Sequence, residues 1–177
     1  MSDTKPADSP RQMTPEEAAE FAEQVFNKAR EGDAAMLAAL LSKGLPANLR
    51  NHKGDTLLML ASYHGHVDAV KVLLEHKADP EVRNDNGQSP IAGAAFKGDL
   101  AVVKALIEGG AQVEGASFDG RTALMMAAMF NRTEIIDYLI SKGADPKAKD
   151  ANGITALDAA KTMGATDTVA QIEKLLG

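Results

Sequence analysis

Apolar residues recur along this chain of 177 residues in two rows that repeat every 33 positions. The first row is Leu37, Val70, Val103, Ile136 and Val169, and the second is Leu40, Leu73, Leu106, Leu139 and Ile172. Spacings of three and four residues within each unit place these side chains on one face of a helix. One pair of helices cannot bury such a face, so we expect successive pairs to stack and share one core.

Helix starts follow the same period as the apolar rows. Glycines mark it at Gly54, Gly87, Gly120 and Gly153. Two residues after each glycine stands a hydroxyl residue that can cap a helix: Thr56, Ser89, Thr122 and Thr155. Three residues before each glycine stands a turn-forming residue: Asn51, Asn84, Ser117 and Asp150. Each unit is therefore predicted to open with a turn and to continue into a helix.

Small residues predict how the two helices of a unit are joined and packed. The link between them falls at Gly65, Gly98, Asn131 and Gly164. Alanines that would let neighbouring first helices approach closely stand at Ala61, Ala94, Ala127 and Ala160. The second helices should end in a left-handed turn at Gly44, Gly110 and Gly143. Lys77 takes this place in another unit, where the same conformation would be costly for a residue with a Cβ.

The two ends of the chain depart from the repeat. Thr14, Pro15 and Glu17 form a capping box, which predicts an extended first helix that covers the start of the stack. Lys161 and Glu173 replace small or apolar residues of the inner units, so the last unit should face water. Residues 1–13 are predicted as a disordered tail and 14–177 as one domain. Within it we expect capping units at 14–50 and 150–177 and inner units at 51–83, 84–116 and 117–149.

These motifs resemble those of ankyrin-repeat proteins over residues 18–177. The family's Thr-Pro-Leu-His-like start appears here as TLLML, SPIAG, TALMM and TALDA, followed by Ala, a Gly-His step and a closing Gly-Ala-Asp. The resemblance implies an all-α solenoid of about five stacked helix-turn-helix units with projecting β-turn or hairpin loops. The family's histidine is replaced in all four units, by Met59, Ala92, Met125 and Asp158. Its hydrogen bonds between turns must then be replaced or absent.

Composition narrows the classes of function. The chain contains no cysteine, which excludes disulfides, thiolate zinc sites and cysteine nucleophiles. Its net charge of -6 argues against a nucleic-acid-binding protein. The first residues lack the apolar run of a secretion signal, and no stretch approaches 18 apolar residues. We therefore expect no membrane contact and a cytoplasmic protein, and the length of the chain suggests a stand-alone bacterial one.

Signatures of catalysis and metal binding are weak. The sequence contains no GxxxxGK[ST], GxGxxG, HExxH or GxSxG motif, so we expect no enzyme, no catalytic residue and no cofactor. His52, His64 and His66 leave a metal- or small-molecule-responsive protein as an alternative. Because no acidic or cysteine partner recurs beside them, we expect no metal site. His66 matches the Gly-His step of the family and is interpreted as structural.

Exposed positions that vary between units are the candidate binding surface. At the ends of the first helices they resemble the concave binding surface of the family. The candidate partner-binding residues are Tyr63, His64, Phe96, Lys97, Phe118, Arg121, Met129 and Phe130. Aromatic side chains supply large contact areas with little rotamer entropy to lose. The alternative is that Tyr63, Phe96 and Phe130 only cover seams between neighbouring first helices.

The sequence thus favours a non-enzymatic protein–protein interaction module, an adaptor that is a monomer on its own and binds a protein partner through its concave face. A permanent regulatory or inhibitory subunit of an enzyme is an alternative. The turns add a mildly basic rim, which as a solvated edge needs no function: Arg50, His52, Lys53, Arg83, Arg121, Lys147 and Lys149. If the rim contributes to binding, it favours an acidic partner segment over nucleic acid.

Overall fold

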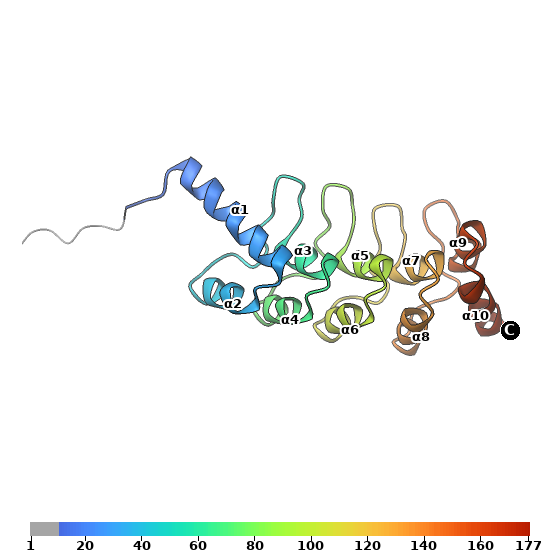
Figure 1. Ribbon diagram of the computed structural model, residues 1–177. Helices are drawn as coiled ribbons and strands as arrows, with labels where there is room; N and C mark the ends of the chain where they lie inside the picture. Colours follow the sequence, from blue (N-terminus) through green and yellow to red (C-terminus); the bar gives the residue numbers. More distant parts are fainter. Residues whose placement is uncertain (1–10) are drawn as a thin grey trace, which may run out of the picture.

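The computed structural model describes residues 11–177 and shows a stack of five helix pairs (Figure 1). Its ten helices in this range are α1 (Pro15–Glu31), α2 (Ala34–Ser42), α3 (Leu57–Tyr63), α4 (Val67–Glu75), α5 (Pro90–Lys97), α6 (Leu100–Glu108), α7 (Ala123–Met129), α8 (Thr133–Ser141), α9 (Ala156–Met163) and α10 (Thr166–Leu176). Turns project on one side, beside the row of α3, α5, α7 and α9 (Figure 1). The predicted all-α repeat solenoid is therefore confirmed. The predicted disordered tail lies largely outside the described residues, and residues 11–13 form no regular secondary structure.

Hydroxyl side chains start the first helices as the sequence predicts. The hydroxyls of Thr56, Ser89, Thr122 and Thr155 each accept a hydrogen bond from the backbone N–H three residues further on. At the start of α1, the Thr14 hydroxyl accepts from the Glu17 N–H at 3.1 Å, and the Glu17 carboxylate accepts from the Thr14 N–H at 2.9 Å. These bonds satisfy backbone donors that the first turn of a helix leaves free.

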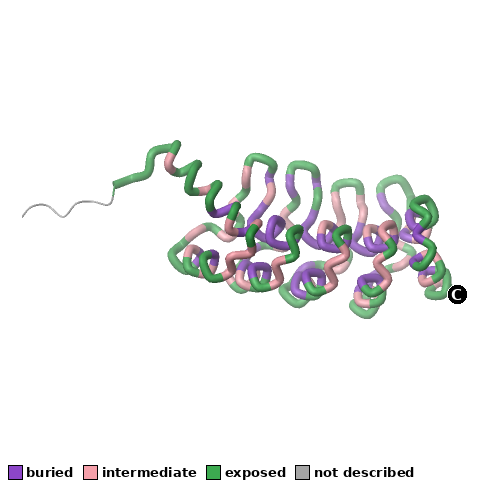
Figure 2. The backbone as a smooth tube through the Cα atoms, viewed as in Figure 1, coloured by how far each residue is buried: buried purple, intermediate pink, exposed green. Residues whose placement is uncertain are grey.

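The core lies where neighbouring units meet. Helix α3 packs between α1 and α5, and α7 packs between α5 and α9. The four predicted alanines of this row are fully buried: Ala61, Ala94, Ala127 and Ala160. Figure 2 shows the buried positions as an almost continuous line along the stack, with exposed residues on the turns and outer edges. At the two ends of the stack the predicted apolar rows are less completely buried. Leu40 and Val169 are only partly buried, because neighbours are missing on one side.

Backbone hydrogen bonds between adjacent turns replace those that the missing histidines would support. The donors and acceptors are Asp85 N–H to Lys53 O at 3.0 Å, Phe118 N–H to Gly87 O at 3.0 Å, and Ala151 N–H to Asp119 O at 2.8 Å. The substitute at Asp158 acts locally instead, because its carboxylate accepts from the Thr155 N–H at 3.1 Å. Hydrogen bonds from the Thr155 backbone and side chain lower the pKa of Asp158. The turns thus remain tied without the family's histidine.

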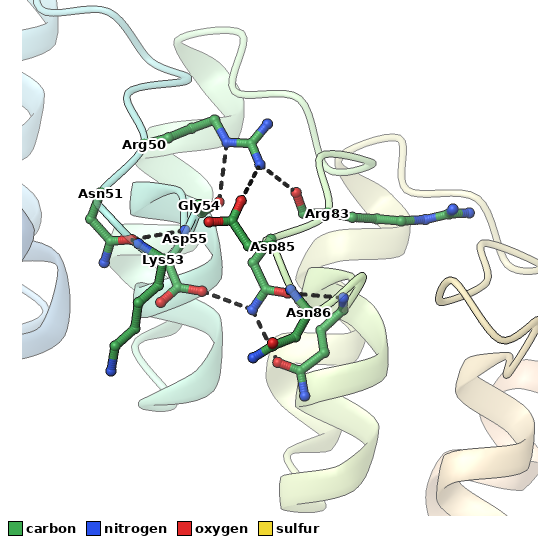
Figure 3. Close-up of polar contacts among 10 residues, drawn as sticks. Arg50, Asn51, Lys53, Gly54, Asp55, Arg83, Asp85 and Asn86 are labelled. Carbon is green, nitrogen blue, oxygen red and sulfur yellow. Dashed lines mark hydrogen bonds and ion pairs between the residues drawn. The ribbon is translucent and has the colours of Figure 1, made fainter.

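Side chains add a second set of bonds between turns (Figure 3). Arg50 Nη2 donates to the Arg83 carbonyl at 2.9 Å, and Asn84 Nδ2 donates to Asp55 Oδ1 at 2.9 Å. On the opposite edge a ladder joins consecutive units: Asp79 N–H donates to Asn48 at 2.8 Å, Gln112 N–H to Glu81 at 2.7 Å, and Asp145 N–H to Glu114 at 2.7 Å. The sequence analysis did not predict this ladder, which fixes the register of one unit on the next.

The links between helices also reach back to the preceding unit. The Nε2–H of His66 donates to the Arg30 carbonyl at 2.7 Å, and its ring lies against Gly32, where a Cβ would overlap it. Arg132 Nη2 makes the equivalent bond to the Phe96 carbonyl at 3.2 Å. A carbonyl at the end of each earlier helix is satisfied in this way. His66 is therefore engaged in the scaffold, as the Gly-His step implies.

Two residues other than glycine adopt a left-handed backbone within residues 11–177. Lys77 has φ 70° and Asn131 has φ 60°. Lys77 occupies the position that is glycine in other units, and its side chain is exposed. Asn131 differs, because its Oδ1 accepts from the N–H groups of Asp167 at 3.1 Å and Thr168 at 3.0 Å. It therefore caps α10, whose own N-cap residue makes no side-chain bond.

We expect Lys77→Gly to raise the free energy of unfolding by about 1 kcal/mol, because glycine adopts the left-handed turn without a Cβ clash. Chemical denaturation of both proteins measures the difference. A midpoint that falls or stays constant would contradict this account of the turn.

Asn131→Gly should have the opposite sign and lower the free energy of unfolding. Asparagine tolerates the left-handed conformation better than lysine, so little strain is relieved, whereas losing the cap of α10 costs about 1 kcal/mol. The same denaturation assay tests it, with Lys77→Gly as the matched control. If Asn131→Gly stabilised the protein as much as Lys77→Gly, the cap would contribute nothing.

Candidate partner-binding groove

A groove of about 810 Å³ runs across α3, α5 and α7 beside their turns. Its lining includes seven of the eight candidate residues: Tyr63, His64, Phe96, Phe118, Arg121, Met129 and Phe130. The stack therefore brings together side chains from three units that are far apart in the sequence. That they bind a partner stays a prediction.

Lys97, the eighth candidate residue, lies beside the groove over an aromatic ring. Its Nζ is 4.6 Å from the centroid of the Tyr63 ring, a cation–π geometry. The His64 ring meets the Tyr63 ring edge-on, with centroids 5.5 Å apart. The Tyr63 ring thus contacts Lys97 of the next unit and His64 of its own unit.

The aromatic side chains cover seams and remain accessible at the same time. The Phe96 and Phe130 rings meet edge to face with centroids 4.7 Å apart, which links α5 to the end of α7. The Tyr63 ring lies over Gly93 of α5. Even so, Tyr63 is 43% exposed and Phe96 is 36% exposed, while Phe130 is partly buried. Packing between units therefore positions these rings without removing them from the surface.

Phe118 and Arg121 are fixed by their turn. Phe118 is 78% exposed, but its backbone N–H is bonded to Gly87 and its side chain fills the space that a Cβ on Gly87 would need. Arg121 Nε lies 3.3 Å from the Asp119 carboxylate and 3.9 Å from that of Asp150. Beside this turn the groove thus presents the exposed Phe118 ring and the Arg121 guanidinium, which is paired with carboxylates.

Positive groups surround His64. Its pKa is lowered by burial, and further by the neighbouring charges of His66, Lys97 and Arg30. A protonated imidazole is disfavoured in such a place because it meets other cations.

Some of the lining was not predicted from the sequence. Met59, Leu60 and Met126 contribute apolar surface to the groove. The Tyr63 ring lies at ordinary van der Waals distance from Gly93, because a Cβ there would be 3.8 Å from Tyr63 Cδ2. Gly93 stands where two other units have Leu60 and Met126, so its departure from the repeat was visible in the sequence, but its contact with Tyr63 was not.

The histidines do not converge on a metal site. Residues 11–177 contain no group of three or more histidine, aspartate or glutamate side chains placed to hold a metal ion. The His64 and His66 rings are stacked with centroids 6.5 Å apart, and His66 Nε2 is occupied by the Arg30 carbonyl. None of the ten helices between residues 11 and 177 has the length and apolar character needed to cross a membrane.

Comparison with known proteins places the repeats in a family. The family model for ankyrin repeats, three copies, matches residues 25–116 and 94–172. A protein of Pseudomonas aeruginosa described as an ankyrin repeat protein is 59% identical over 65 residues, which is 37% of this chain and 38% of the relative. Human ankyrin repeat domain-containing protein 29 is 42% identical over 60 residues, 33% of this chain and 20% of the relative. Human ankyrin repeat domain-containing protein 63 is 44% identical over 48 residues, 27% of this chain and 13% of the relative.

The matched segments span well under half the length of these curated relatives, so the likeness concerns the repeats themselves. The family match, by contrast, extends over most of the chain and agrees with the stacked helix pairs. The chain therefore belongs to the ankyrin-repeat family.

Proposed function

We propose that this protein is a non-enzymatic adaptor that binds one protein partner through the groove across α3, α5 and α7. Ankyrin repeats are generally protein–protein interaction modules. The observation that carries the proposal is the set of accessible aromatic rings along one groove, Tyr63, Phe96, Phe118 and Phe130. Such rings provide the anchors on which protein interfaces depend. The protein acts as a monomer in the cytoplasm, with one domain from residue 14 to 177.

The mechanism is the presentation of anchors that are already ordered. Each ring is held by contacts between units, such as Phe96 on Phe130 and Phe118 on Gly87. Little side-chain freedom remains to be lost when a partner binds, which lowers the entropic cost of association. The polar residues His64, Lys97 and Arg121 then select the partner, because their polar and charged groups must find complements.

Replacing both Phe96 and Phe130 with alanine should weaken partner binding at least tenfold, because two anchors are lost. The midpoint of thermal unfolding should fall by only a few degrees, since the rings are partly exposed. Affinity capture from a lysate of the source cells, followed by binding measurements with the captured protein, compares the two forms. Phe21→Ala is the control, because Phe21 is 37% exposed on α1 and lies outside the groove.

A large fall in the unfolding midpoint with unchanged binding would show that the rings serve only to seal the stack. A complex that survives long dilution would instead identify a permanent subunit of an enzyme, because such assemblies bury larger and more apolar interfaces. Loss of binding in both the double variant and the Phe21→Ala control would place the contact elsewhere.

A further inference from the structure

The groove divides into two parts of different chemistry. One part, across the turn before α3 and the end of that helix, contains Lys53 and His64, with Lys97 beside them. The other part, across α5 and α7, contains Phe96 and Phe130 together with methionines. An occupant of the whole groove therefore meets cations at one end and apolar rings at the other.

The cations of the first part lack carboxylate partners. Among residues 11–177 no carboxylate oxygen lies within 4.0 Å of the ammonium groups of Lys53 or Lys97. Figure 3 shows the Lys53 side chain extending away from the hydrogen-bonded network of its turn. Arg30 differs, because its guanidinium lies 3.1 Å from Glu23. The two lysines therefore form no ion pair within the described part of the chain, and both can meet an anionic group of a partner.

The carboxylates that line the groove are already engaged. Asp55 accepts a hydrogen bond from Asn84 at 2.9 Å. Asp119 accepts from the backbone N–H of Arg121 at 3.2 Å and pairs with its guanidinium at 3.3 Å. The amide of Asn84 is uncharged, so Asp55 keeps its negative charge. Together with Lys97 and the Glu23 partner of Arg30, the groove has four cationic side chains and three carboxylates, a small positive excess on a chain that carries -6 as a whole. A local positive site on an acidic protein attracts and orients an anionic group.

We propose that the groove accepts an acidic segment of another protein, with one carboxylate beside His64 and Lys97, another acidic group facing Lys53, and a large apolar side chain on Phe96 and Phe130. This inference rests on the proposed function and names the chemistry of its partner. A nucleic acid fits less well, because two unpaired lysines on a chain of net charge -6 offer little phosphate neutralisation. The apolar part of the groove also requires a side chain that nucleic acids do not carry.

The surroundings of His64 agree with a missing carboxylate. Burial lowers the pKa of His64 most, and the charges of His66, Lys97 and Arg30 lower it further, while Tyr63 packs on its ring edge-on. The nearby carboxylates have partners within the chain: Glu23 pairs with Arg30, and Asp99, which lies against Gly65, accepts from the Val102 N–H. A carboxylate bound between Lys97 and His64 would reverse the balance of charge around the imidazole.

A library of random 12-residue peptides displayed on phage provides the probe, selected on the full chain at 50 mM NaCl. We expect the selected peptides to be enriched in Asp or Glu and to contain a large apolar residue. Fluorescein-labelled copies should bind about tenfold more weakly to Lys53→Gln/Lys97→Gln, and more weakly to the wild type at 300 mM NaCl. Lys71→Gln/Lys174→Gln is the control of equal charge change, because both lysines are exposed and lie outside the groove.

The outcomes separate this inference from the proposed function. Peptides that require Phe96 and Phe130 but show no acidic bias, or that ignore the Lys53/Lys97 substitutions, overturn the inference and leave the binding groove standing. Failure to select any peptide that depends on the groove overturns the inference. Affinity capture from the lysate then tests whether the groove binds a partner at all. A 20-nucleotide single-stranded DNA that binds as tightly as the peptides overturns it in favour of a general polyanion site. Self-association that the lysine variants abolish in sedimentation velocity assigns the groove to a second copy instead.

Nuclear magnetic resonance titration of the histidines gives an independent readout. Binding of an acidic peptide should raise the pKa of His64, because a carboxylate stabilises the imidazolium. A pKa that is higher in the complex means proton uptake on binding, so affinity should increase as pH falls through the titration range of His64. His76 is the internal control, since its Nδ1 is bonded to the Val72 carbonyl outside the groove. An unchanged or lowered pKa of His64 in the complex would place the carboxylate elsewhere.

Discussion

Burial between neighbouring units is the constraint on which this structure depends. The first helices meet through alanines with no exposed surface, such as Ala61, Ala94 and Ala127. A larger side chain there would push two helices apart, because protein interiors have little free volume. The groove crosses α3, α5 and α7, so it exists only while those contacts hold the three helices in register. The same contacts between helices therefore form both the scaffold and the candidate site.

The sequence predicted the features that recur in every unit. It did not predict the contacts that residues of different units make with one another. Thr56 and Ala61 have counterparts at the same positions of other units. Their roles, as a helix cap and as a site of close helix contact, can therefore be inferred from the sequence of a single unit. Glu81 and Glu114 are also periodic, yet a charged residue on an edge looks like a solvated one. Their bonds to backbone N–H groups of the next unit become evident only when two units stand side by side. Within the candidate site, the contact between Gly93 and the Tyr63 ring was hidden for the same reason.

The aromatic rings both pack between neighbouring units and remain exposed on the surface. In a closed globule a ring that packs on its neighbours is removed from water, but in an open stack it has neighbours along the stack and solvent across it. Phe96 shows both, since it meets Phe130 edge to face and still exposes 36% of its surface. Contacts along the stack restrict the rotamer, and exposure across the stack leaves an apolar face available. This combination explains why the choice between the two roles could not be made from residue types.

The polar side chains of the turns and those at the end of α5 are paired differently. In the turns, Asn84 bonds Asp55 and Arg50 bonds the Arg83 carbonyl. Lys97 instead faces an aromatic ring, as Lys104 and Lys142 do at Tyr138, and such a contact at an exposed site contributes about as much as a surface ion pair. A chain with 25 acidic residues could supply a carboxylate at little cost in folding, because a surface ion pair contributes under about 1 kcal/mol. Departures from local complementarity concentrate at functional sites. Because the stack would gain little from such a pair, the absence of a carboxylate beside Lys97 costs little stability and leaves its charge available to the proposed acidic partner.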